Sequence, residues 1–327
     1  MKESEIRNRG VLDEYLKLVE DDVKHFFQPG SFISAGCPAC NVSGGSPEFK
    51  KLGFQYVSCK SCGTLFVNPR PPFEMLKKFY SDSVSSRFWT EKFFKPMVES
   101  RRDKIFKPRA EYAAKAFGFT SGAVIGDIGA GFGLFLEEIR KIAPGNEYVA
   151  IEPSLDMSKI CGEKKLKTKC MCLEEVCGME EGFDALTAFE LFEHLQEPVS
   201  FLKKTLSLLK PGGHLLLTTL NGSGFDILLL WEKSKSITPP HHLNFLNPRS
   251  AEILLKRVGF EITEISTPGK LDWDIVEGMI KNEGVDLGRF WNSLARSGTE
   301  VFKGELQNWI SRNNLSSHMR ILARRPR

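Results

Sequence analysis

Four of the eight cysteines fall into two closely spaced pairs. Cys37 and Cys40 form one Cys-x-x-Cys pair, Cys59 and Cys62 form the other, and 18 residues separate the two pairs. Each pair places two sulfurs on one side of a tight turn, and four thiolates complete the tetrahedral shell of a structural zinc ion. Because that shell leaves no open position for catalysis, the pattern predicts a structural zinc site. An iron–sulfur cluster, a redox dithiol and unbound cysteines are the alternatives.

A glycine-rich turn follows the first predicted strand of the central region. Asp127 precedes three glycines at alternate positions: Gly129, Gly131 and Gly133. The third glycine comes one residue too early for a dinucleotide fingerprint, and no Gly-Lys-Ser/Thr ending marks a Walker loop. Such a turn lets the backbone approach a ligand closely, which favours a cofactor with a cationic amino-acid end over a polyphosphate. Glu152 follows the second predicted strand, where a carboxylate can accept both hydroxyls of an unphosphorylated ribose.

Two carboxylates and an imidazole follow the fourth predicted strand, at Glu190, Glu193 and His194. On a helix, positions i, i+3 and i+4 share one face. That face can bind a divalent cation, with His241 or His242 as a further ligand from downstream. The alternative, which we prefer, is a metal-free segment that packs and caps the helix.

His241 and His242 follow Pro239 and Pro240 in the connection between the fifth predicted strand and the next helix. Ligands bind outside the carboxyl ends of parallel strands, so this connection borders the predicted site. An imidazole with a pKa near neutrality can take a proton from an attacking hydroxyl. Sequence alone does not rank the two histidines, and either one could instead cap or pack.

The elements that must position these residues alternate between strands and helices from residue 123 onward. Candidate strands cover 123–128, 147–151, 168–172, 184–189, 214–219, 260–266 and 317–323. Apolar residues recur at helical spacing between them, for example at Phe135, Leu136 and Ile139. This alternation predicts βαβ units, a parallel sheet and an α/β fold class.

The predicted domains follow changes in composition along the chain. Pro69, Pro71 and Pro72 mark one boundary. We expect an N-terminal helix over 1–30, a zinc ribbon over 31–72, a helical cap or linker over 73–122 and a catalytic domain over 123–327 with a helical insertion at about 268–316.

Taken together, the motifs resemble those of class I S-adenosylmethionine-dependent methyltransferases. Asp127–Gly133 resembles their first motif, Phe183–Phe189 their fourth strand, and Leu209–Gly213 the turn before their fifth strand. The resemblance covers about 123–266. It implies a Rossmann-like core of seven strands, S-adenosylmethionine as the cofactor and methyl transfer as the reaction.

The resemblance also implies roles for individual residues. Asp127 and the glycines would hold the methionine end of the cofactor, and Glu152 would hold its ribose. Residues near the adenine would come from the ends of two strands. The full cofactor-binding set is then Asp127, Gly129, Gly131, Gly133, Glu152, Cys172, Leu173 and Phe189.

A narrower resemblance concerns the acceptor. The ribbon followed by Phe66–Pro71, then His241–Phe245, then Ser316–Arg320, is similar to bacterial zinc-ribbon methyltransferases associated with polysaccharide and modified-sugar biosynthesis. It implies O- or C-methylation of a sugar, a nucleotide-linked sugar or a glycan. Glu190–His194 is also similar to the metal-binding segment of small-RNA 2′-O-methyltransferases. The helices near 271–313 enlarge the usual hairpin between the last two strands, so the family predicts the acceptor pocket poorly.

Composition restricts the remaining classes. The 327 residues are 41% hydrophobic and 26% charged, with a net charge of +4, which is typical of a globular protein and too balanced to indicate nucleic-acid binding. No run approaches about 18 uncharged apolar residues, and the charged N-terminus lacks a signal sequence, so we expect a cytoplasmic protein without a membrane span.

Two other functions remain open at this point. One is RNA methylation, because some ribosomal RNA methyltransferases carry an N-terminal zinc module. The chain shows no basic stripe and no Asn-Pro-Pro-aromatic motif after the fourth predicted strand. The other is a non-enzymatic binding protein with a methyltransferase-like fold, against which the intact glycine turn argues.

Overall fold

The computed structural model describes residues 2–327, the side chain of Pro29 excepted, and divides into two compact units. The first unit holds the described residues up to Met97, together with Leu220–Ala251 and Ser266–Met319. The second holds Val98–Thr219, Glu252–Ile265 and Arg320–Arg327. The predicted domain boundaries at 30, 72 and 122 stay predictions.

A seven-stranded sheet forms the second unit, with the strand order β10-β11-β8-β7-β4-β5-β6. The strands are β4 (Ser121–Ile128), β5 (Gly145–Ile151), β6 (Lys167–Lys169), β7 (Phe183–Phe189), β8 (Leu209–Leu220), β10 (Glu261–Ser266) and β11 (His318–Arg324). The pairs around β4, from β6 across to β8, are all parallel. This confirms the predicted α/β fold. The order switches at β4, where parallel sheets of this kind place their ligands.

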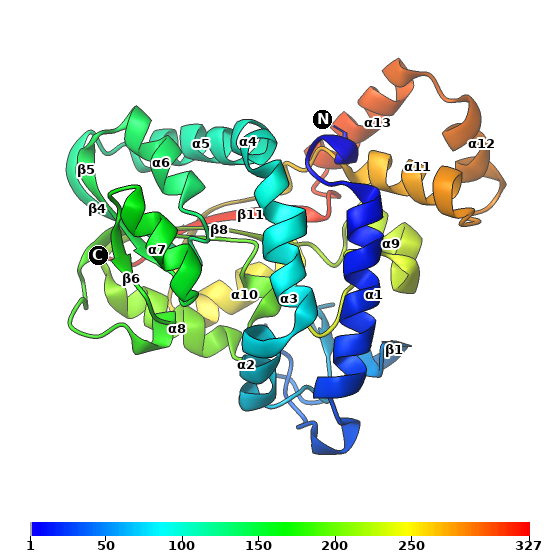
Figure 1. Cartoon of the computed structure of the whole chain (residues 1–327), viewed down its shortest axis with the longest axis horizontal. Helices are drawn as coiled ribbons and strands as arrows, with labels where there is room; N and C mark the ends of the chain where they lie inside the picture. The colour runs from blue at the N-terminus through cyan, green and yellow to red at the C-terminus, as the bar shows by residue number, and fades with distance from the viewer. Residues whose placement is uncertain (1) are drawn as a thin grey trace. The chain divides into compact units, whose positions relative to one another are not determined.

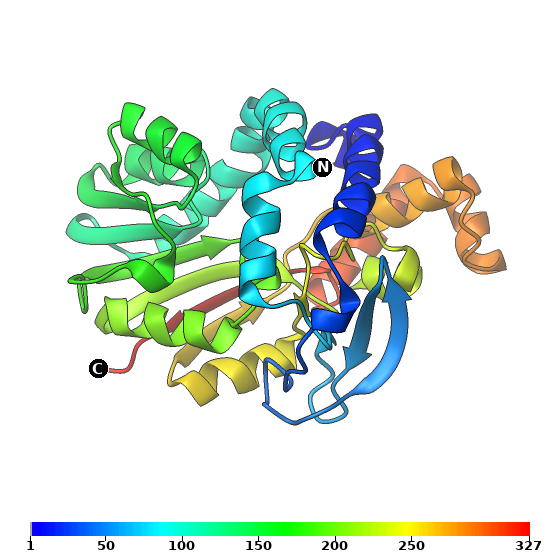
Figure 2. The same ribbon diagram turned by 60° about the horizontal axis from the view of Figure 1, so that its bottom comes forward.

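Helices cover both faces of this sheet, which is why its central strands read as nearly continuous apolar runs. The helices are α4 (Val98–Arg101), α5 (Lys107–Phe117), α6 (Leu134–Ile142), α7 (Leu155–Glu163), α8 (Pro198–Leu208) and α10 (Pro248–Val258). In Figure 2, α5 and α6 lie on one face, and α8 and α10 lie on the other. Ile125, Phe135 and Ala185 belong to the buried core on the α5–α6 side.

A small antiparallel sheet lies in the first unit, in the order β1-β2-β3-β9. Its strands are β1 (Ser46–Lys51), β2 (Phe54–Ser58), β3 (Leu65–Val67) and β9 (Asn244–Phe245). The first cysteine pair precedes β1, and the second pair lies in the turn between β2 and β3. The fourth strand comes from a segment far away in the sequence, directly after His242.

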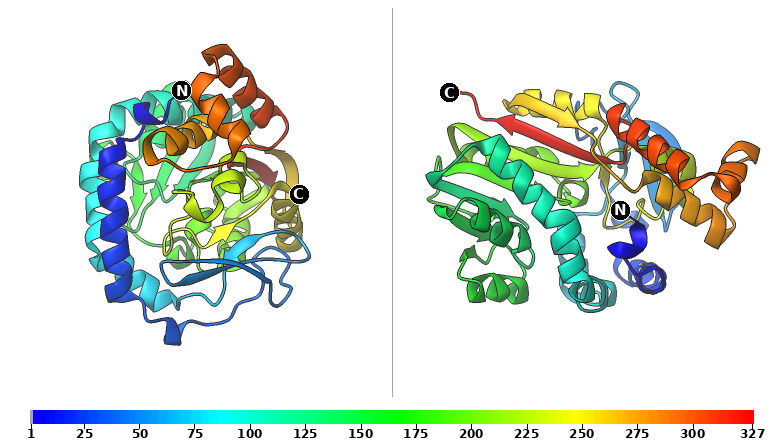
Figure 3. Two further views of the ribbon diagram at one scale, coloured as in Figure 1. Left: turned by 90° about the vertical axis from the view of Figure 1, so that its right-hand side faces the viewer. Right: turned by 90° about the horizontal axis from the view of Figure 1, so that it is seen from above.

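Helices complete the first unit. They are α1 (Arg9–Phe26), α2 (Phe73–Asp82), α3 (Val84–Phe88), α9 (Phe225–Leu230), α11 (Asp272–Glu283), α12 (Arg289–Ser297) and α13 (Glu300–Arg312). The first helix begins at Arg9 because the Asn8 side chain accepts the Val11 N–H at 3.3 Å, as an N-cap does. It runs beside α3 in Figure 1. Figure 3 shows α11 with α12 and α13, the helical elaboration expected near the C-terminus.

None of the helices within residues 2–327 combines the length and the apolar run that crossing a lipid bilayer requires.

Candidate functional site

The three glycines after β4 serve different purposes. All have positive φ angles, +68° at Gly129, +55° at Gly131 and +69° at Gly133, which favour glycine over other residues. A Cβ atom on Gly133 would lie 2.7 Å from Leu166 Cδ1, so this glycine lets α6 pack closely. A Cβ on Gly131 would meet no protein atom within 4 Å. Gly131 therefore faces open space, where a ligand can approach the backbone.

Glu152 is joined directly to this turn. One carboxylate oxygen, Oε2, accepts the Gly131 N–H at 2.7 Å, and the other accepts the Ser154 N–H at 2.9 Å. The side chain is only 6% exposed, and its burial raises the pKa of the carboxyl. A carboxylate has about four acceptor positions, so both oxygens keep capacity for hydroxyl donors. Two backbone bonds thus hold Glu152 as a ribose-binding carboxylate would be held.

Asp127 is the second-last residue of β4, and its carboxyl is buried, at 3% exposure. Its Oδ1 accepts a hydrogen bond of 2.6 Å from the Thr187 hydroxyl on neighbouring β7. Burial raises the pKa of Asp127 to about 7, although the Thr187 bond and the charge of Arg109 oppose the increase. The site therefore holds an acid near its titration point, which a cationic ligand would ionise.

Arg109, which sequence reasoning missed, belongs to the same group of residues. Its Nη2 donates to Glu190 Oε1 at 2.6 Å, and its guanidinium lies 4.9 Å from the centre of the Phe189 ring. In the sequence, the only signal for these contacts is the position of Arg109 on α5, the helix before β4. A basic residue at such a place is otherwise an ordinary surface charge.

The helix predicted for Glu190–His194 does not form, and that expectation was wrong. Glu190 has φ +51°, and only Phe192–His194 makes a single 3₁₀ turn. The Glu190 carboxylate also accepts the Thr218 hydroxyl at 2.7 Å, because β8 runs directly beside β7. Among the described residues, Glu190 joins no convergent group of metal-binding atoms. The shared helical face that would have collected a cation is therefore missing.

Glu193 is a buried carboxyl of the second unit. Its Oε2 accepts the Thr219 hydroxyl at 2.9 Å, and the side chain is 2% exposed. Burial, and then the nearby charge of Glu190, raise the pKa of Glu193 above its usual range. This carboxyl is therefore suited to donating a proton in a hydrogen bond.

The three residues assigned to the adenine lie at strand ends of the second unit. Cys172 is half-buried at the start of a 3₁₀ turn, and Leu173 follows as a buried side chain. The Phe189 ring is half-buried at the end of β7, 4.7 Å from the Phe135 ring. Their contact with a cofactor stays a prediction.

The structure ranks the two histidines. His241 is 7% exposed, and its ring lies 5.0 Å from Phe79, 5.5 Å from Tyr80 and 5.8 Å from Tyr15. Burial lowers the pKa of His241 to about 3, so this imidazole stays neutral and is a poor proton acceptor at neutral pH. We therefore place His241 with the aromatic packing and keep only His242 as the candidate base.

His242 has the opposite character. It is half-buried, and its Nδ1 lies 2.6 Å from the carbonyl oxygen of Ser236. A carbonyl oxygen can only accept, so Nδ1 carries the hydrogen and Nε2 carries the lone pair in the neutral ring. This is the tautomer that a general base acting through Nε2 needs.

The four paired cysteines converge in the first unit. Their sulfurs all lie within 4.8 Å of one another, with 3.5 Å between Cys37 and Cys62 and 3.4 Å between Cys40 and Cys59. Four sulfurs at the usual 2.3 Å from one zinc ion would stand about 3.8 Å apart, so the set fits zinc. Burial opposes ionisation of Cys59, but the N–H groups of Cys62 and Ser61 hold its pKa below the usual value. Burial raises the pKa values of Cys37 and Cys62, so a bound cation would have to ionise these two thiols.

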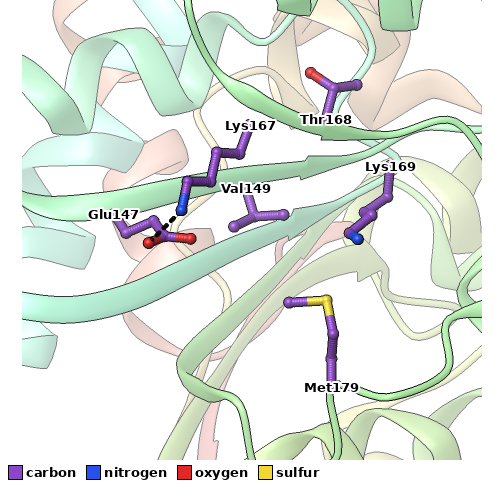
Figure 4. A pocket seen from close by; sticks show the side chains of 6 residues that line it. All are labelled: Glu147, Val149, Lys167, Thr168, Lys169 and Met179. Atoms are coloured by element: carbon purple, nitrogen blue, oxygen red, sulfur yellow. Dashed lines mark ion pairs between the residues drawn. The ribbon is translucent and has the colours of Figure 1, made fainter.

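A separate hollow of about 430 Å³ lies at the edge of the large sheet (Figure 4). Its lining comes from β5, β6 and the loop before β7: Glu147, Val149, Lys167, Thr168, Lys169 and Met179. Lys167 pairs there with Glu147 at 2.7 Å. None of the predicted site residues lines this hollow, so the candidate site does not depend on it.

Comparison with known proteins agrees with this geometry. Ubiquinone biosynthesis O-methyltransferase of Xanthomonas axonopodis pv. citri is 27% identical over 159 residues, which are 45% of this chain and 66% of that protein. The enzyme of the same name from Alkalilimnicola ehrlichii is 31% identical over 148 residues, 43% of this chain and 57% of that protein. The match thus spans less than two thirds of the length of either relative.

The fold is also found in solved structures. A chain from a complex that contains the Haloferax volcanii Trm112 methyltransferase activator superposes with a TM-score of 0.51 at 13% identity, over 73% of this chain and 96% of that one. At this identity the likeness concerns the fold alone. A family model for methyltransferase domains matches residues 97–265, more than half of the chain. The glycine turn, Asp127, Glu152 and the strands β4 to β8 all lie within that match. The chain belongs to the methyltransferase-domain family.

Proposed function

We propose that the protein transfers a methyl group from S-adenosylmethionine to a hydroxyl of a small polar acceptor. The observation that carries the proposal is the 2.7 Å bond between the Gly131 N–H and Glu152. This bond joins the glycine turn after β4 to the acid after β5. Space for a ligand remains beside Gly131, where an added Cβ would meet no atom within 4 Å. Family membership supports the same cofactor.

Within the second unit, each cofactor-facing residue has one task. Asp127, once ionised, accepts hydrogen bonds from the ammonium of the methionine end. Glu152 accepts the two ribose hydroxyls, and Leu173 and Phe189 offer apolar surface to the adenine. When bound, S-adenosylmethionine supplies a methyl group already activated by its sulfonium. The contribution of the chain is therefore mainly alignment for in-line attack.

His242 is our candidate for the proton transfer. An acceptor hydroxyl loses its proton as the methyl group arrives, and an imidazole with a free-solution pKa of about 6.5 suits that step. The proton passes to Nε2, while Nδ1–H stays bound to the Ser236 carbonyl. His241 takes no part in this step.

The acceptor class rests on two different signals. The zinc-ribbon motifs favour a sugar, a nucleotide-linked sugar or a glycan, and thus polysaccharide biosynthesis. The curated relatives are named for O-methylation in ubiquinone biosynthesis. The name of the relatives specifies an oxygen nucleophile, and the zinc-ribbon resemblance allows O- or C-methylation. We therefore propose O-methylation and retain the sugar class as the first to test.

The proposed metal content is one zinc ion at Cys37, Cys40, Cys59 and Cys62, with a structural role. A divalent cation at Glu190, Glu193 and His194 stays a prediction, and Glu190 itself binds Arg109 and Thr218.

Calorimetry with S-adenosylmethionine and its demethylated product tests the cofactor site. Glu152→Ala should weaken binding by about 1–3 kcal/mol, the cost of leaving charge-assisted hydrogen bonds unmade. Glu147→Ala, at the sheet edge, is the matched control and should bind normally. Unchanged affinity in Glu152→Ala would remove the ribose assignment, and preference for a nicotinamide dinucleotide would overturn the proposal.

Radiolabelled methyl transfer to a panel of nucleotide-sugars, glycans and phenols then tests the acceptor class. Label in a sugar fraction supports the first choice, and label in a phenol alone would overturn the sugar class. Label in RNA alone would establish the RNA alternative. Cofactor binding without label in any acceptor of the panel or in RNA would favour the non-enzymatic alternative.

A further inference from the structure

We propose that the zinc ribbon positions His242, and that this is the ribbon's role in the protein. The inference rests on the proposed function, because it takes His242 as the base. All residues involved belong to the first unit.

The ribbon's sheet includes the chain directly after His242. Strand β9 pairs with β3, so that Leu65 stands opposite Phe245 and Phe66 opposite Asn244. The Val67 N–H also donates to the carbonyl oxygen of Leu243 at 3.0 Å. The backbone is therefore held by the ribbon from one residue beyond the imidazole.

A buried tyrosine of the ribbon holds His242 itself. The hydroxyl of Tyr56, on β2, donates to the carbonyl oxygen of His242 at 2.7 Å, and Tyr56 is 0% exposed. Leu243 and Phe245 are also 0% exposed and belong with Tyr56 to one hydrophobic cluster. A buried carbonyl that loses such a donor costs the fold free energy, so the bond specifies where residue 242 lies.

A second tie starts at the metal-binding turn. The Asn247 side-chain Nδ2 donates to the carbonyl oxygen of Cys62 at 2.9 Å, and Asn247 is 8% exposed. Its Oδ1 accepts the Ser250 N–H at 2.8 Å, so the amide is held from both sides. Gly63, with φ +72°, leaves room for this amide, since an added Cβ would lie 3.1 Å from Nδ2.

The hydrogen bonds from Tyr56 and Asn247 hold the backbone around His242 in place, and the Ser236 carbonyl holds its imidazole ring. Zinc binding commonly supplies the folding free energy of such small ribbons. If the ribbon unfolds locally, the Tyr56 bond to the His242 carbonyl and the pairing of β3 with β9 are both lost. The imidazole is then no longer held within hydrogen-bond distance of the Ser236 carbonyl. The aim and tautomer of the imidazole then depend on a metal that takes no part in the chemistry.

Nitrogen–proton NMR of the histidine rings tests the proposal without any acceptor. We compare Tyr56→Phe with Tyr148→Phe, which removes an equivalent hydroxyl-to-carbonyl bond, 2.6 Å to Ala143, in the second unit. Tyr56→Phe should shift the His242 ring signals and mix its tautomers, with zinc content and cofactor affinity unchanged. Tyr148→Phe should leave the His242 signals as they are. Wild-type His242 signals and pKa in Tyr56→Phe would overturn the proposal.

Asn247→Asp supplies a second variant, because it removes the donor to Cys62 and keeps the acceptor for Ser250. It should move the His242 signals in the same way, and it decides the question if Tyr56→Phe fails to fold. Zinc removal by a chelator should disturb the His242 signals before those of His214, which lies in the second unit. Simultaneous loss of both sets would contradict the proposed path.

Turnover distinguishes this inference from the proposed function. With an acceptor that the panel identifies, Tyr56→Phe should lower kcat by about 10-fold or more through misplacement of the base. If His242→Ala keeps normal turnover while Tyr56→Phe still moves the ring signals, the base role fails and the positioning stands. If His242→Ala is inactive and Tyr56→Phe is normal in both readouts, the positioning fails and the base role stands.

Discussion

At the scale of single residues, the candidate site depends on acidic side chains, and their burial controls whether they are ionised. Asp127 is the clearest case, because its pKa of about 7 lies within the physiological range. A neutral Asp127 accepts hydrogen bonds poorly from an ammonium group, and an ionised one accepts them well. Cofactor binding should therefore be coupled to the loss of a proton.

We expect the affinity for S-adenosylmethionine to increase as the pH rises from 6 to 8. The free protein holds a proton on Asp127 below about pH 7, and the bound cation must displace it. Calorimetry in two buffers of different ionisation enthalpy measures the released proton. Asp127→Asn should bind more weakly and without this pH dependence; an equally steep profile in that variant would assign the proton to Glu152.

The glycines of the turn should separate stability from binding. Gly131→Ala should cost about 1–2 kcal/mol in unfolding free energy through its positive φ, and its Cβ should block the cofactor. Gly133→Ala adds a clash with Leu166 and should cost a further 1–3 kcal/mol or so. Urea unfolding and calorimetry on both variants check this. Normal cofactor affinity in Gly131→Ala would show that the ligand does not use the open space there.

At the scale of elements, the cysteine knuckles and their strands should form one metal-dependent unit. The purified protein should contain about one zinc per chain by elemental analysis. A double variant, Cys59→Ala with Cys62→Ala, should lose the metal. Cys170→Ala with Cys177→Ala is the matched control, because both thiols are exposed and outside the cluster. Zinc that persists in the first double variant would refute the site.

A buried acid pair joins α9 to α11 in the first unit. The Ser317 hydroxyl lies within hydrogen-bond distance of both Asp226 and Asp272, and burial, followed by the charge of Asp272, raises the pKa of Asp226 to about 7. The folded protein then holds a proton that the unfolded chain releases near pH 4. The contribution of this group to stability is complete below about pH 4 and declines as the pH rises toward 7.

Asp226→Asn should remove that decline. Relative to the variant, the wild type should lose a few kcal/mol, by order of magnitude, between pH 4.5 and 7, and no more above that. Urea unfolding of both proteins across this range measures the difference in their free energies of unfolding. The titration of other acids affects both proteins equally and cancels. A difference that stays constant with pH would show that Asp226 is already ionised.

At the scale of the whole molecule, a net charge of +4 on 327 residues argues for a small acceptor. Nucleic-acid binding typically weakens by about 10³-fold or more between 50 and 200 mM salt, because bound counterions are released. We expect turnover on the acceptor to change by less than about threefold over that range. Inhibition by added RNA that disappears with salt would instead support the RNA alternative.

Much of the fold could be predicted because the information is local. Strands buried on both faces read as short apolar runs, so the observed strands β4, β5, β7 and β10 lie within two residues of the predicted ones. The glycine turn could be predicted from three glycines at alternate positions, which the positive φ angles of this turn favour. The paired cysteines do the same through their spacing, and here the structure brings all four sulfurs together.

Other features depended on which segments meet in space. Glu190 leaves the expected helix because Arg109 and Thr218 hold its carboxylate, and neither partner is near it in the sequence. His241 and His242 look alike in the chain. Only the packed aromatic rings around one and the Ser236 carbonyl beside the other make them different.

The parallel sheet, the cysteine cluster, the glycine turn and the acids Asp127 and Glu152 could therefore be predicted from the sequence. Two features became visible only in the three-dimensional structure: the different burial of the two histidines, and the continuation of the ribbon's sheet into the strand after His242. The physical reason is that backbone conformation and the periodicity of burial depend mainly on residues that are close together in the sequence. Desolvation, tautomer and hydrogen-bond partnership arise from residues far apart in the chain, 186 positions in the case of Tyr56 and His242.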